Sequence, residues 1–260
     1  MKSTLTIAAG FEKTLGAAGL DRFERLMAFQ APASAVTRAV PGRFTVRVEL
    51  SPAPEGCAGV GAADGGGAER LVVFLKRYRG LLRAPAAALE WRRLQEAAAT
   101  GIPCPEPVAL GERRGLFGAT ESLLATREIA GAAQADWWIR DHGDRRSDLV
   151  GAVGRLARRF HEAGFHHQDL YLCHFFVREG AAGGLDLFLI DLQRCGRLGA
   201  LRRRWIVKDL GQVHFSLGQA GFGREHWEEF LQAYGPQGRE LEAAVLRKSR
   251  RIARHVPRYG

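Results

Sequence analysis

Two acidic residues that bracket a predicted β-hairpin constrain the fold of this chain most strongly. Asp169 lies before the apolar run at residues 175–177, and Asp191 directly follows a second run at 185–190. Glycines between residues 180 and 184 predict the turn that joins the two strands. Because a hairpin returns the chain to its starting end, we expect the two carboxylates to be neighbours. Such a pair suits magnesium-dependent phosphoryl transfer, in which one acid holds the metal and the other orients the attacking hydroxyl.

A lysine and a glutamate upstream extend this set. Residues 71–76 form a β-branched and aromatic run of strand length that ends at Lys76. Residues 85–99 predict a helix, and Glu90 lies on its apolar face. A carboxylate on that face requires a cation, and Lys76 is the nearest candidate in sequence. A solvent-exposed lysine, and a surface pair between Glu90 and a neighbouring arginine of the helix, are the alternatives.

The remaining patterns predict a small lobe of mixed α and β structure followed by a mainly helical region. The predicted elements are a strand at 43–50, a flexible Gly/Ala-rich insertion at 51–68, strands at 108–110 and 116–129, a helix from an N-cap at Ser147 to a stop at Gly164, and basic helices from about Leu201 onward. Together they predict an α+β chain.

The charge balance predicts an anionic partner. Lys and Arg total 38 against 28 for Asp and Glu, which gives a formal net charge of +10. Nucleic acid, phosphorylated substrates and anionic membrane are all compatible with this charge. Since 46% of the residues are hydrophobic, the composition is typical of a folded globular protein. No run approaches the roughly 18 apolar residues of a membrane span, and the four cysteines form no C-x-x-C pair, which favours a reducing cytoplasm.

Basic residues cluster at residues 202–204 and near the C-terminus, where the set comprises Arg247, Lys248, Arg250, Arg251, Arg254 and Arg258. A solvated helix face and attachment to anionic lipid headgroups are both consistent with these clusters. No recognisable nucleic-acid motif accompanies the charge, so we expect no nucleic-acid partner.

The order of these residues resembles the protein-kinase-like superfamily. His167-Gln168-Asp169 is similar to the H-x-D catalytic loop, His174 stands at the position of the loop Asn, and residues 190–192 stand at the D-F-G position. Within the superfamily, the runs H-x-D-x-Y-x-C-H-F and I-D-L-x-R resemble the bacterial lipopolysaccharide kinase (Kdo/WaaP) family. Further runs similar to that family are Glu90-Trp91-Arg92, Gly101-Ile102-Pro103, Arg204-Trp205 and Lys208-Asp209-Leu210. The resemblance spans about residues 40 to 215.

The resemblance implies a two-lobed, protein-kinase-like α+β fold. Its N-lobe, a small mixed β-sheet with an αC-like helix, would comprise residues 1–129, and its mainly helical C-lobe residues 130–260. Lys76 would contact the ATP phosphates and be oriented by Glu90. The backbone of residues 126–129, with Glu128 and Ile129 at its end, would meet adenine.

The same resemblance implies the roles of the acids. Asp169 would be the catalytic residue that orients the acceptor hydroxyl and takes its proton. Asp191 would bind Mg²⁺, and His174 would be a second, poorer magnesium ligand or would brace the loop. The implied acceptor is a sugar hydroxyl of the lipopolysaccharide inner core, heptose ahead of Kdo.

The implied partners are the lipopolysaccharide core oligosaccharide or lipid A precursor and the anionic inner face of the inner membrane, reached from the cytoplasm. A kinase for another small molecule or a protein is one alternative. A non-catalytic nucleotide-binding scaffold is another alternative. The single glycine of the Pro41-Gly42 turn and His174 favour it, whereas the retention of Lys76, Glu90 and both aspartates opposes it.

Two further motifs have a structural and a functional interpretation. Four histidines, His161, His166, His167 and His174, are candidate zinc ligands, although His161 fits a packed histidine better. The adjacent Trp137 and Trp138 suit either core packing or stacking on a sugar.

Overall fold

The structure, a computed structural model, describes residues 2–50, 70–81, 86–115, 119–180, 183–235 and 238–255. The insertion predicted at 51–68 lies outside these residues. The chain divides into two compact units. Unit 1 comprises Met1–Leu94 and Pro105–Glu128, and unit 2 comprises Gln95–Cys104 and Ile129–Gly260.

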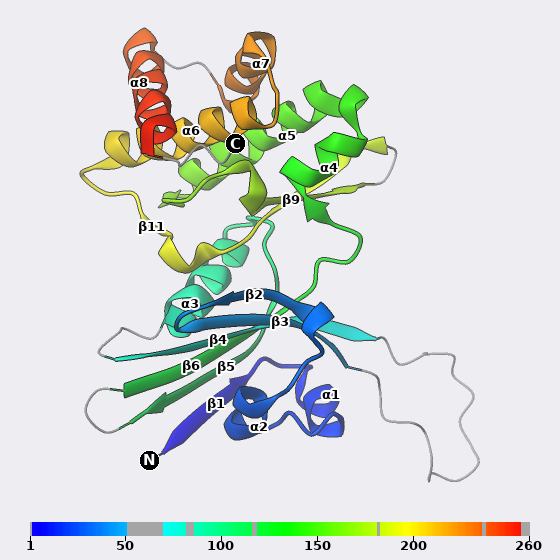
Figure 1. Ribbon diagram of the computed structural model, residues 1–260. Coiled ribbons are helices and arrows are strands. Elements are labelled where there is room, and N and C mark those ends of the chain that lie inside the picture. Colours follow the sequence, from blue (N-terminus) through cyan, green and yellow to red (C-terminus); the bar gives the residue numbers. More distant parts are fainter. Residues whose placement is uncertain are drawn as a thin grey trace. The chain divides into compact units, whose positions relative to one another are not determined.

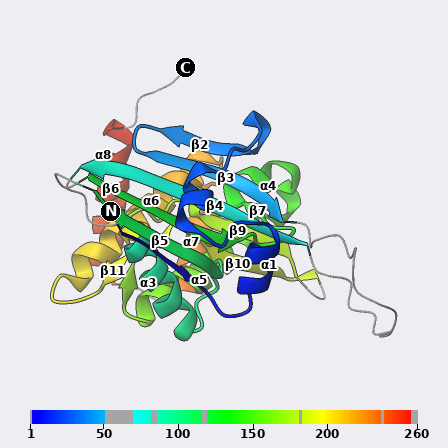
Figure 2. The same cartoon turned by 90° about the horizontal axis from the view of Figure 1, so that it is seen from below.

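Unit 1 is built on a six-stranded sheet in the order β1-β5-β6-β4-β3-β2 (Figure 2). The strands are β1 (Ser3–Ile7), β2 (Val36–Val40), β3 (Arg43–Leu50), β4 (Leu71–Leu81), β5 (Pro107–Arg114) and β6 (Ala119–Arg127). Every pair is antiparallel, so the prediction of a mixed sheet is wrong in this respect. The physical reason is that the helical crossover from β4 leads to β5, which pairs with β6 and β1 and not with β4.

The two faces of β4 have different environments. Leu71, Val73 and Leu75 point to the hydrophobic core, which α1 (Glu12–Ala17) and α2 (Phe23–Ala28) complete. Figure 1 shows these two helices and α3 (Ala86–Ala99) on opposite sides of the sheet. Since side chains alternate along a strand, Lys76 points away from this core.

The N-terminal part of unit 1 was not predicted from the sequence. This part comprises β1, α1, α2, the 3-10 helix η1 (Ala33–Ala35) and β2. The helices α1 and α2 have six residues each, too few for a clear apolar period to emerge.

Unit 2 is mainly helical. Its helices are α4 (Ala135–Asp141), η3 (Gly143–Arg145), α5 (Arg146–Glu162), η4 (Leu172–His174), η6 (Leu192–Arg194), α6 (Arg202–Gln219), α7 (Arg224–Tyr234) and α8 (Arg239–His255). Its strands are β7 (Ala133–Gln134), β8 (Phe165–His166), β9 (Phe175–Glu179), β10 (Leu185–Leu189) and β11 (Gly196–Arg197). The helices α6, α7 and α8 form the basic C-terminal region that the sequence predicts.

The strongest predicted helix is present as α5, with its apolar stripe buried. Gly164, at φ 85°, follows its end as predicted. The N-cap prediction is wrong, because α5 begins at Arg146 after Arg145. Ser147 lies inside the first turn, and its hydroxyl donates to Glu229 of α7 at 3.2 Å instead of capping the helix.

The predicted hairpin is also present. β9 and β10 pair antiparallel, with Phe175 opposite Leu189 and Glu179 opposite Leu185. Asp169 therefore precedes the hairpin and Asp191 follows it at the same end.

Among the described residues, no helix combines the length and the apolar character that crossing a bilayer requires.

Candidate active site

In unit 1, a buried ion pair joins β4 to α3. The Lys76 ammonium lies 2.5 Å from Oε1 of Glu90, and the two side chains are 12% and 1% exposed. The Tyr78 hydroxyl, two residues further along the same face of β4, donates to Oε2 of Glu90 at 3.3 Å. Both glutamate oxygens therefore bind groups of β4. This excludes the alternative that Lys76 is exposed to solvent. The pair matches the arrangement by which a strand lysine is oriented to hold phosphates.

The segment after β6 is fixed by its own contacts. The Glu128 amide donates to the Val72 carbonyl at 2.8 Å, and the Glu128 carboxylate accepts hydrogen bonds from Arg47 at 2.6 and 2.9 Å. In unit 2, the Ile129 carbonyl accepts from the Ala132 amide at 3.1 Å. The Glu128 side chain thus has a structural partner, and the backbone is the part of this segment that remains for a ligand.

In unit 2, Asp209 of α6 organises the loop that carries Asp169. Its fully buried carboxylate accepts the amide hydrogens of His167 and Gln168 at 2.7 and 2.9 Å. Burial alone would raise the pKa of Asp209, but the His161 hydrogen bond and charge and the His167 amide outweigh it, so the pKa is lowered. Asp209 is therefore ionised, and its carboxylate holds the backbone of the loop through these two amides. From the sequence, Asp209 was noted only within a family run and was given no role.

The same loop contains a backbone conformation that side chains rarely adopt. Gln168 has φ 71°, which for a non-glycine residue costs on the order of 1 kcal/mol. Gln212 of α6 stabilises the strained turn by donating to the Gln168 carbonyl at 2.7 Å and accepting the Leu170 amide at 3.0 Å. This strain lies one residue before Asp169, as is common at functional sites.

His167 links this loop to the end of β10. Its Nε2 lies 3.0 Å from the Ile190 carbonyl, and its Nδ1 lies 3.3 Å from the Asp169 amide. Burial, followed by the His174 ring, lowers the pKa of His167 to about 4. The ring is therefore neutral near pH 7, with Nε2 donating and Nδ1 accepting.

His174 makes a second link between the two segments. Its Nδ1 lies 2.5 Å from the Asp169 carbonyl, and its own carbonyl accepts the Ile190 amide at 3.0 Å. Asp191 follows in the left-handed conformation, at φ 57°. Burial, followed by the Asp136 charge, raises the pKa of the neighbouring Cys173 thiol to about 11, and the Asp191 and Asp169 carboxylates act more weakly in the same direction. The loop and the end of the hairpin thus form one hydrogen-bonded cluster.

An arginine covers the proposed base. The Nη1 atom of Arg194, in η6, lies 3.0 and 2.9 Å from the two carboxylate oxygens of Asp169. Arg194 occurs in the I-D-L-x-R run, but its role was not predicted, because a contact across 25 residues leaves no local signal.

The acids of this cluster fit a magnesium ion. Mg²⁺ in phosphoryl-transfer sites is commonly held by one or two carboxylates together with substrate phosphates. Within the described ranges, no group of three or more His, Cys, Asp or Glu side chains is arranged to hold a metal ion. Asp191 would supply the hard oxygen ligand. The Nδ1 atom of His174 is hydrogen-bonded to the Asp169 carbonyl, which leaves Nε2 for any ligand.

The other candidate ligands have structural contacts. His161 binds the Tyr234 hydroxyl through Nδ1 at 2.8 Å and Asp209 through Nε2 at 3.3 Å. His166 stacks on Trp205 with ring centroids 4.2 Å apart. The two tryptophans of α4 differ: Trp138 is buried and stacks on His142, whereas Trp137 is 61% exposed.

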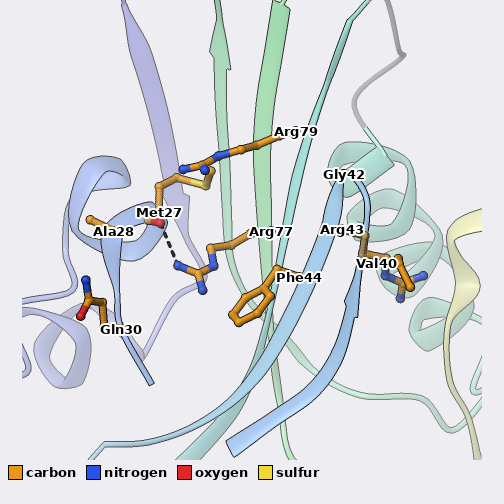
Figure 3. A pocket seen from close by; sticks show the side chains of 9 residues that line it. All are labelled: Met27, Ala28, Gln30, Val40, Gly42, Arg43, Phe44, Arg77 and Arg79. Atoms are coloured by element: carbon orange, nitrogen blue, oxygen red, sulfur yellow. Dashed lines mark hydrogen bonds between the residues drawn. The ribbon is translucent and has the colours of Figure 1, made fainter. Parts of the chain in front are cut away.

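A separate cavity of about 570 Å³ lies in unit 1 between the α2 region and the β2–β3 hairpin (Figure 3). It is lined by Met27, Ala28, Gln30, Val40, Gly42, Arg43, Phe44, Arg77 and Arg79. Arg77 follows Lys76 in β4, so it points to the opposite face of the sheet. Its guanidinium donates to the carbonyls of Met27 and Phe29, both at 2.8 Å, and so anchors the end of α2. The cavity is therefore distinct from the Lys76–Glu90 pair.

The fold and these residues define a protein-kinase-like phosphotransferase, which confirms the predicted fold class. The chain belongs to the lipopolysaccharide kinase (Kdo/WaaP) family, whose family model matches residues 64–234. The resemblance stated from the sequence is thereby confirmed.

The named relatives cover between about three fifths and nearly all of this chain. The lipopolysaccharide core heptose(I) kinase WaaP of Pseudomonas aeruginosa is 29% identical over 93% of this chain and 94% of its own length. A 3-deoxy-D-manno-octulosonic acid kinase of Xanthomonas campestris is 32% identical over 59% of this chain and 58% of its own. A solved structure of WaaP in complex with acyl carrier protein has a TM-score of 0.70 and 28% identity, and it covers 96% of this chain and 98% of the WaaP chain.

Proposed function

We propose that this chain transfers the γ-phosphoryl group of ATP to a heptose hydroxyl of the lipopolysaccharide inner core. The observation that carries the choice of heptose is the match to a heptose(I) kinase along almost the full length of both chains. The Kdo kinases match about three fifths of this chain, which makes Kdo the second candidate acceptor.

The proposed roles follow from the contacts of each residue. Lys76, held by Glu90, binds the phosphates of ATP. Asp191 holds Mg²⁺, and His174 braces the loop through Nδ1, with Nε2 left as a second ligand atom. When bound, the ion would neutralise charge on the β and γ phosphates. The adenine contacts are assigned to the Glu128 carbonyl and the Ile129 amide, because the Glu128 amide and the Ile129 carbonyl have partners in the chain.

Asp169 is assigned the proton transfer. Its carboxylate orients the acceptor hydroxyl and takes the proton as the phosphoryl group moves to the oxygen. The Arg194 guanidinium binds both oxygens of this carboxylate and so fixes its position. The neutral His167 ring fixes the backbone on which Asp169 and Asp191 are presented.

The partners are also part of the proposal. The exposed arginines of α8 would hold the enzyme at the anionic inner face of the inner membrane, where its acceptor is made. We infer a second partner, acyl carrier protein, because this chain is similar over nearly its full length to the WaaP whose structure was solved in complex with that protein. The formal net charge of +10 favours anionic partners of either kind.

The test is transfer of labelled phosphate from ATP to core lipopolysaccharide purified from a strain that lacks the modification. We expect a labelled heptose, identified by mass spectrometry of the released core. Asp169→Asn should lower turnover by a factor of about 100 or more. Asp186→Asn is the matched control, since Asp186 lies on the same hairpin in an exposed pair with Arg178. Turnover that survives Asp169→Asn would reject the assigned base, and ATP binding without turnover by the wild type would favour the scaffold.

A further inference from the structure

Two cations of unit 2 lie near Asp169, a third lies near one of them, and the phosphotransfer roles above leave two of the three unused. They are Arg194 of η6, Lys208 of α6 and Lys248 of α8. Each of the three side chains is held by a contact within unit 2.

Lys208 is held next to the support of the loop. It immediately precedes Asp209, whose carboxylate binds the His167 and Gln168 amides. The Lys208 ammonium lies 5.6 Å from the ring centroid of Trp205. Trp205 in turn stacks on His166, the last residue of β8, so the ring beside the lysine is itself packed against the start of the loop.

Lys248 approaches the same part of α6 from the neighbouring helix. Its stem crosses Gly211 so closely that a Cβ added at Gly211 would lie 2.7 Å from Cγ of Lys248. Residues 208 and 211 are three apart in a helix and so lie on one face. The glycine therefore lets a cation of α8 reach the face that carries Lys208.

Arg194 completes the group from the side of the loop. One of its nitrogens, Nη1, binds both oxygens of Asp169, while its side chain is 60% exposed. A guanidinium has five N–H donors, so it can bind Asp169 and a ligand at once.

The three cations of this cluster have two carboxylates near them, Asp169 and Asp209. Burial lowers the pKa of Lys208, and Arg194 acts in the same direction, as Lys248 does more weakly. Asp169 and Asp209 oppose that shift, but Asp209 is fully buried and already binds two amides and His161. Among the described residues, the Lys208 ammonium has neither a hydrogen bond nor an ion pair. A partly buried ammonium without such a partner is stabilised when an anion binds to it.

We propose that Lys208, Arg194 and Lys248 form an anion subsite that binds a carboxylate or phosphate carried by the acceptor saccharide. Binding there places the acceptor beside Asp169 and gives the enzyme a preference for an acceptor that is already anionic. The identity of the acceptor rests on the proposed function, whereas the presence of the subsite does not depend on turnover. The subsite differs from the exposed α8 arginines, because Lys208 and Lys248 are partly buried and Arg194 is bonded to Asp169.

Equilibrium binding tests the subsite without nucleotide and without a membrane. The probe is deacylated core oligosaccharide, titrated by calorimetry into wild type and Lys208→Met, whose side chain keeps the packing on Trp205. We expect Lys208→Met to raise the Kd about 10-fold, as the loss of one charge-assisted contact does. Lys208→Arg should restore the Kd to within about threefold. The control Arg224→Met, which removes a charge that is paired with Glu228 on α7, should leave the Kd unchanged.

Two modified probes identify the anion. Carboxyl-reduced oligosaccharide and phosphatase-treated oligosaccharide are titrated in parallel, and the source of the anion is the group whose removal abolishes the difference between wild type and Lys208→Met. In turnover, Lys208→Met should raise the KM for the acceptor and leave the KM for ATP unchanged.

Equal binding by wild type and Lys208→Met, or no binding by the wild type, would overturn the subsite. A difference between the two that persists for an oligosaccharide given both treatments, which lacks the carboxylate and the phosphate, would overturn it as well. Binding that depends on Lys208 without any phosphoryl transfer would support the subsite and reject the proposed function, so the two failures are distinguishable.

Discussion

Glu90 is an almost fully buried carboxylate that has one cation and one hydroxyl as partners. Glu90→Gln would remove the carboxylate charge that is paired with the buried Lys76 ammonium, and breaking such a pair typically costs about 3 to 5 kcal/mol. We therefore expect the free energy of unfolding in urea to fall by about 3 kcal/mol and phosphoryl transfer to fall with it.

A double variant separates the structural role of this pair from its chemical role. Replacing both Lys76 and Glu90 by Met removes both buried charges, and apolar replacements of buried ion pairs are often neutral for stability. We expect Lys76→Met/Glu90→Met to unfold within about 1 kcal/mol of wild type yet to lack ATP-dependent turnover. Full turnover in this variant would show that the pair serves stability alone.

These residues also show which contacts can be predicted from local sequence patterns. The pairing of Lys76 with Glu90 could be predicted, because the period of a strand and the apolar face of a helix each assign a side chain to a surface. The contacts of Asp209 and Arg194 could not, since each bridges 25 residues or more to the Asp169 loop. The left-handed backbone at Gln168 was likewise invisible, because glutamine carries no signal for positive φ.

At the level of elements, the packing of α5 on α7 depends on a glycine. A Cβ added at Gly154 would lie 2.7 Å from the Phe230 carbonyl and 3.1 Å from the Tyr234 amide, which are backbone atoms that cannot move aside easily. Gly154→Ala should therefore lower the free energy of unfolding by about 1 to 3 kcal/mol, despite the better helix propensity of alanine.

Gly151 of the same helix provides the control. There the added Cβ would meet only the end of the flexible Arg155 side chain, at 3.2 Å. Gly151→Ala should gain up to about 1 kcal/mol of stability from helix propensity. Chemical denaturation of both variants checks the pair, and equal effects would contradict the close approach of α7.

The contact of α6 with α8 should make stability depend on pH. His214 binds Ser249 of α8 at 2.8 Å and packs edge-on against Trp227. Burial lowers the pKa of His214, and the nearby Arg250 acts in the same direction. The unfolded chain therefore binds this proton more readily than the folded chain, so stability is complete above the ordinary histidine pKa of about 6.5 and declines as the pH falls through it.

His214→Gln keeps a polar partner for Ser249 and removes the titrating ring. Unfolding free energies measured at pH 8 and pH 5.5 should differ less in His214→Gln than in wild type. A larger difference in the variant would mean that protonated His214 stabilises the fold.

The sequence predicts best the elements that have a clear hydrophobic period or a clear turn signal. The stripe of α5 and the glycine-turned β9–β10 hairpin are present as predicted. The start of α5 was misplaced, because Ser147 is a good N-cap by type but uses its hydroxyl for Glu229 of α7. The strands β1 and β2 were missed, since they form by pairing with β5 and β3, which their own sequences do not encode.

Over the whole molecule, two separate groups of basic side chains contribute to the excess of positive charge. Arg194 binds Asp169, and Lys208 and Lys248 are partly buried on α6 and α8, whereas the arginines of the α8 outer face are exposed to solvent. This outer face consists of Arg247, Arg250, Arg251 and Arg254, whose three- and four-residue spacing places them on one side of the helix. We therefore expect binding of an anionic surface and binding of the acceptor to be separable by mutation.

The outer face of α8 gives the corresponding test. Each arginine near an anionic bilayer contributes about 1 kcal/mol, so replacing all four by Gln should weaken binding to vesicles with anionic lipid by a factor of 10 or more, as measured by sedimentation. A control with the same charge replaces four exposed arginines of other segments, Arg22, Arg25, Arg158 and Arg224. If the control loses as much vesicle binding as the α8 variant, only the net charge of the molecule matters. If the α8 variant alone loses it, while the Kd for deacylated oligosaccharide is unchanged, α8 is the membrane-facing surface and the Lys208 cluster acts on the acceptor alone.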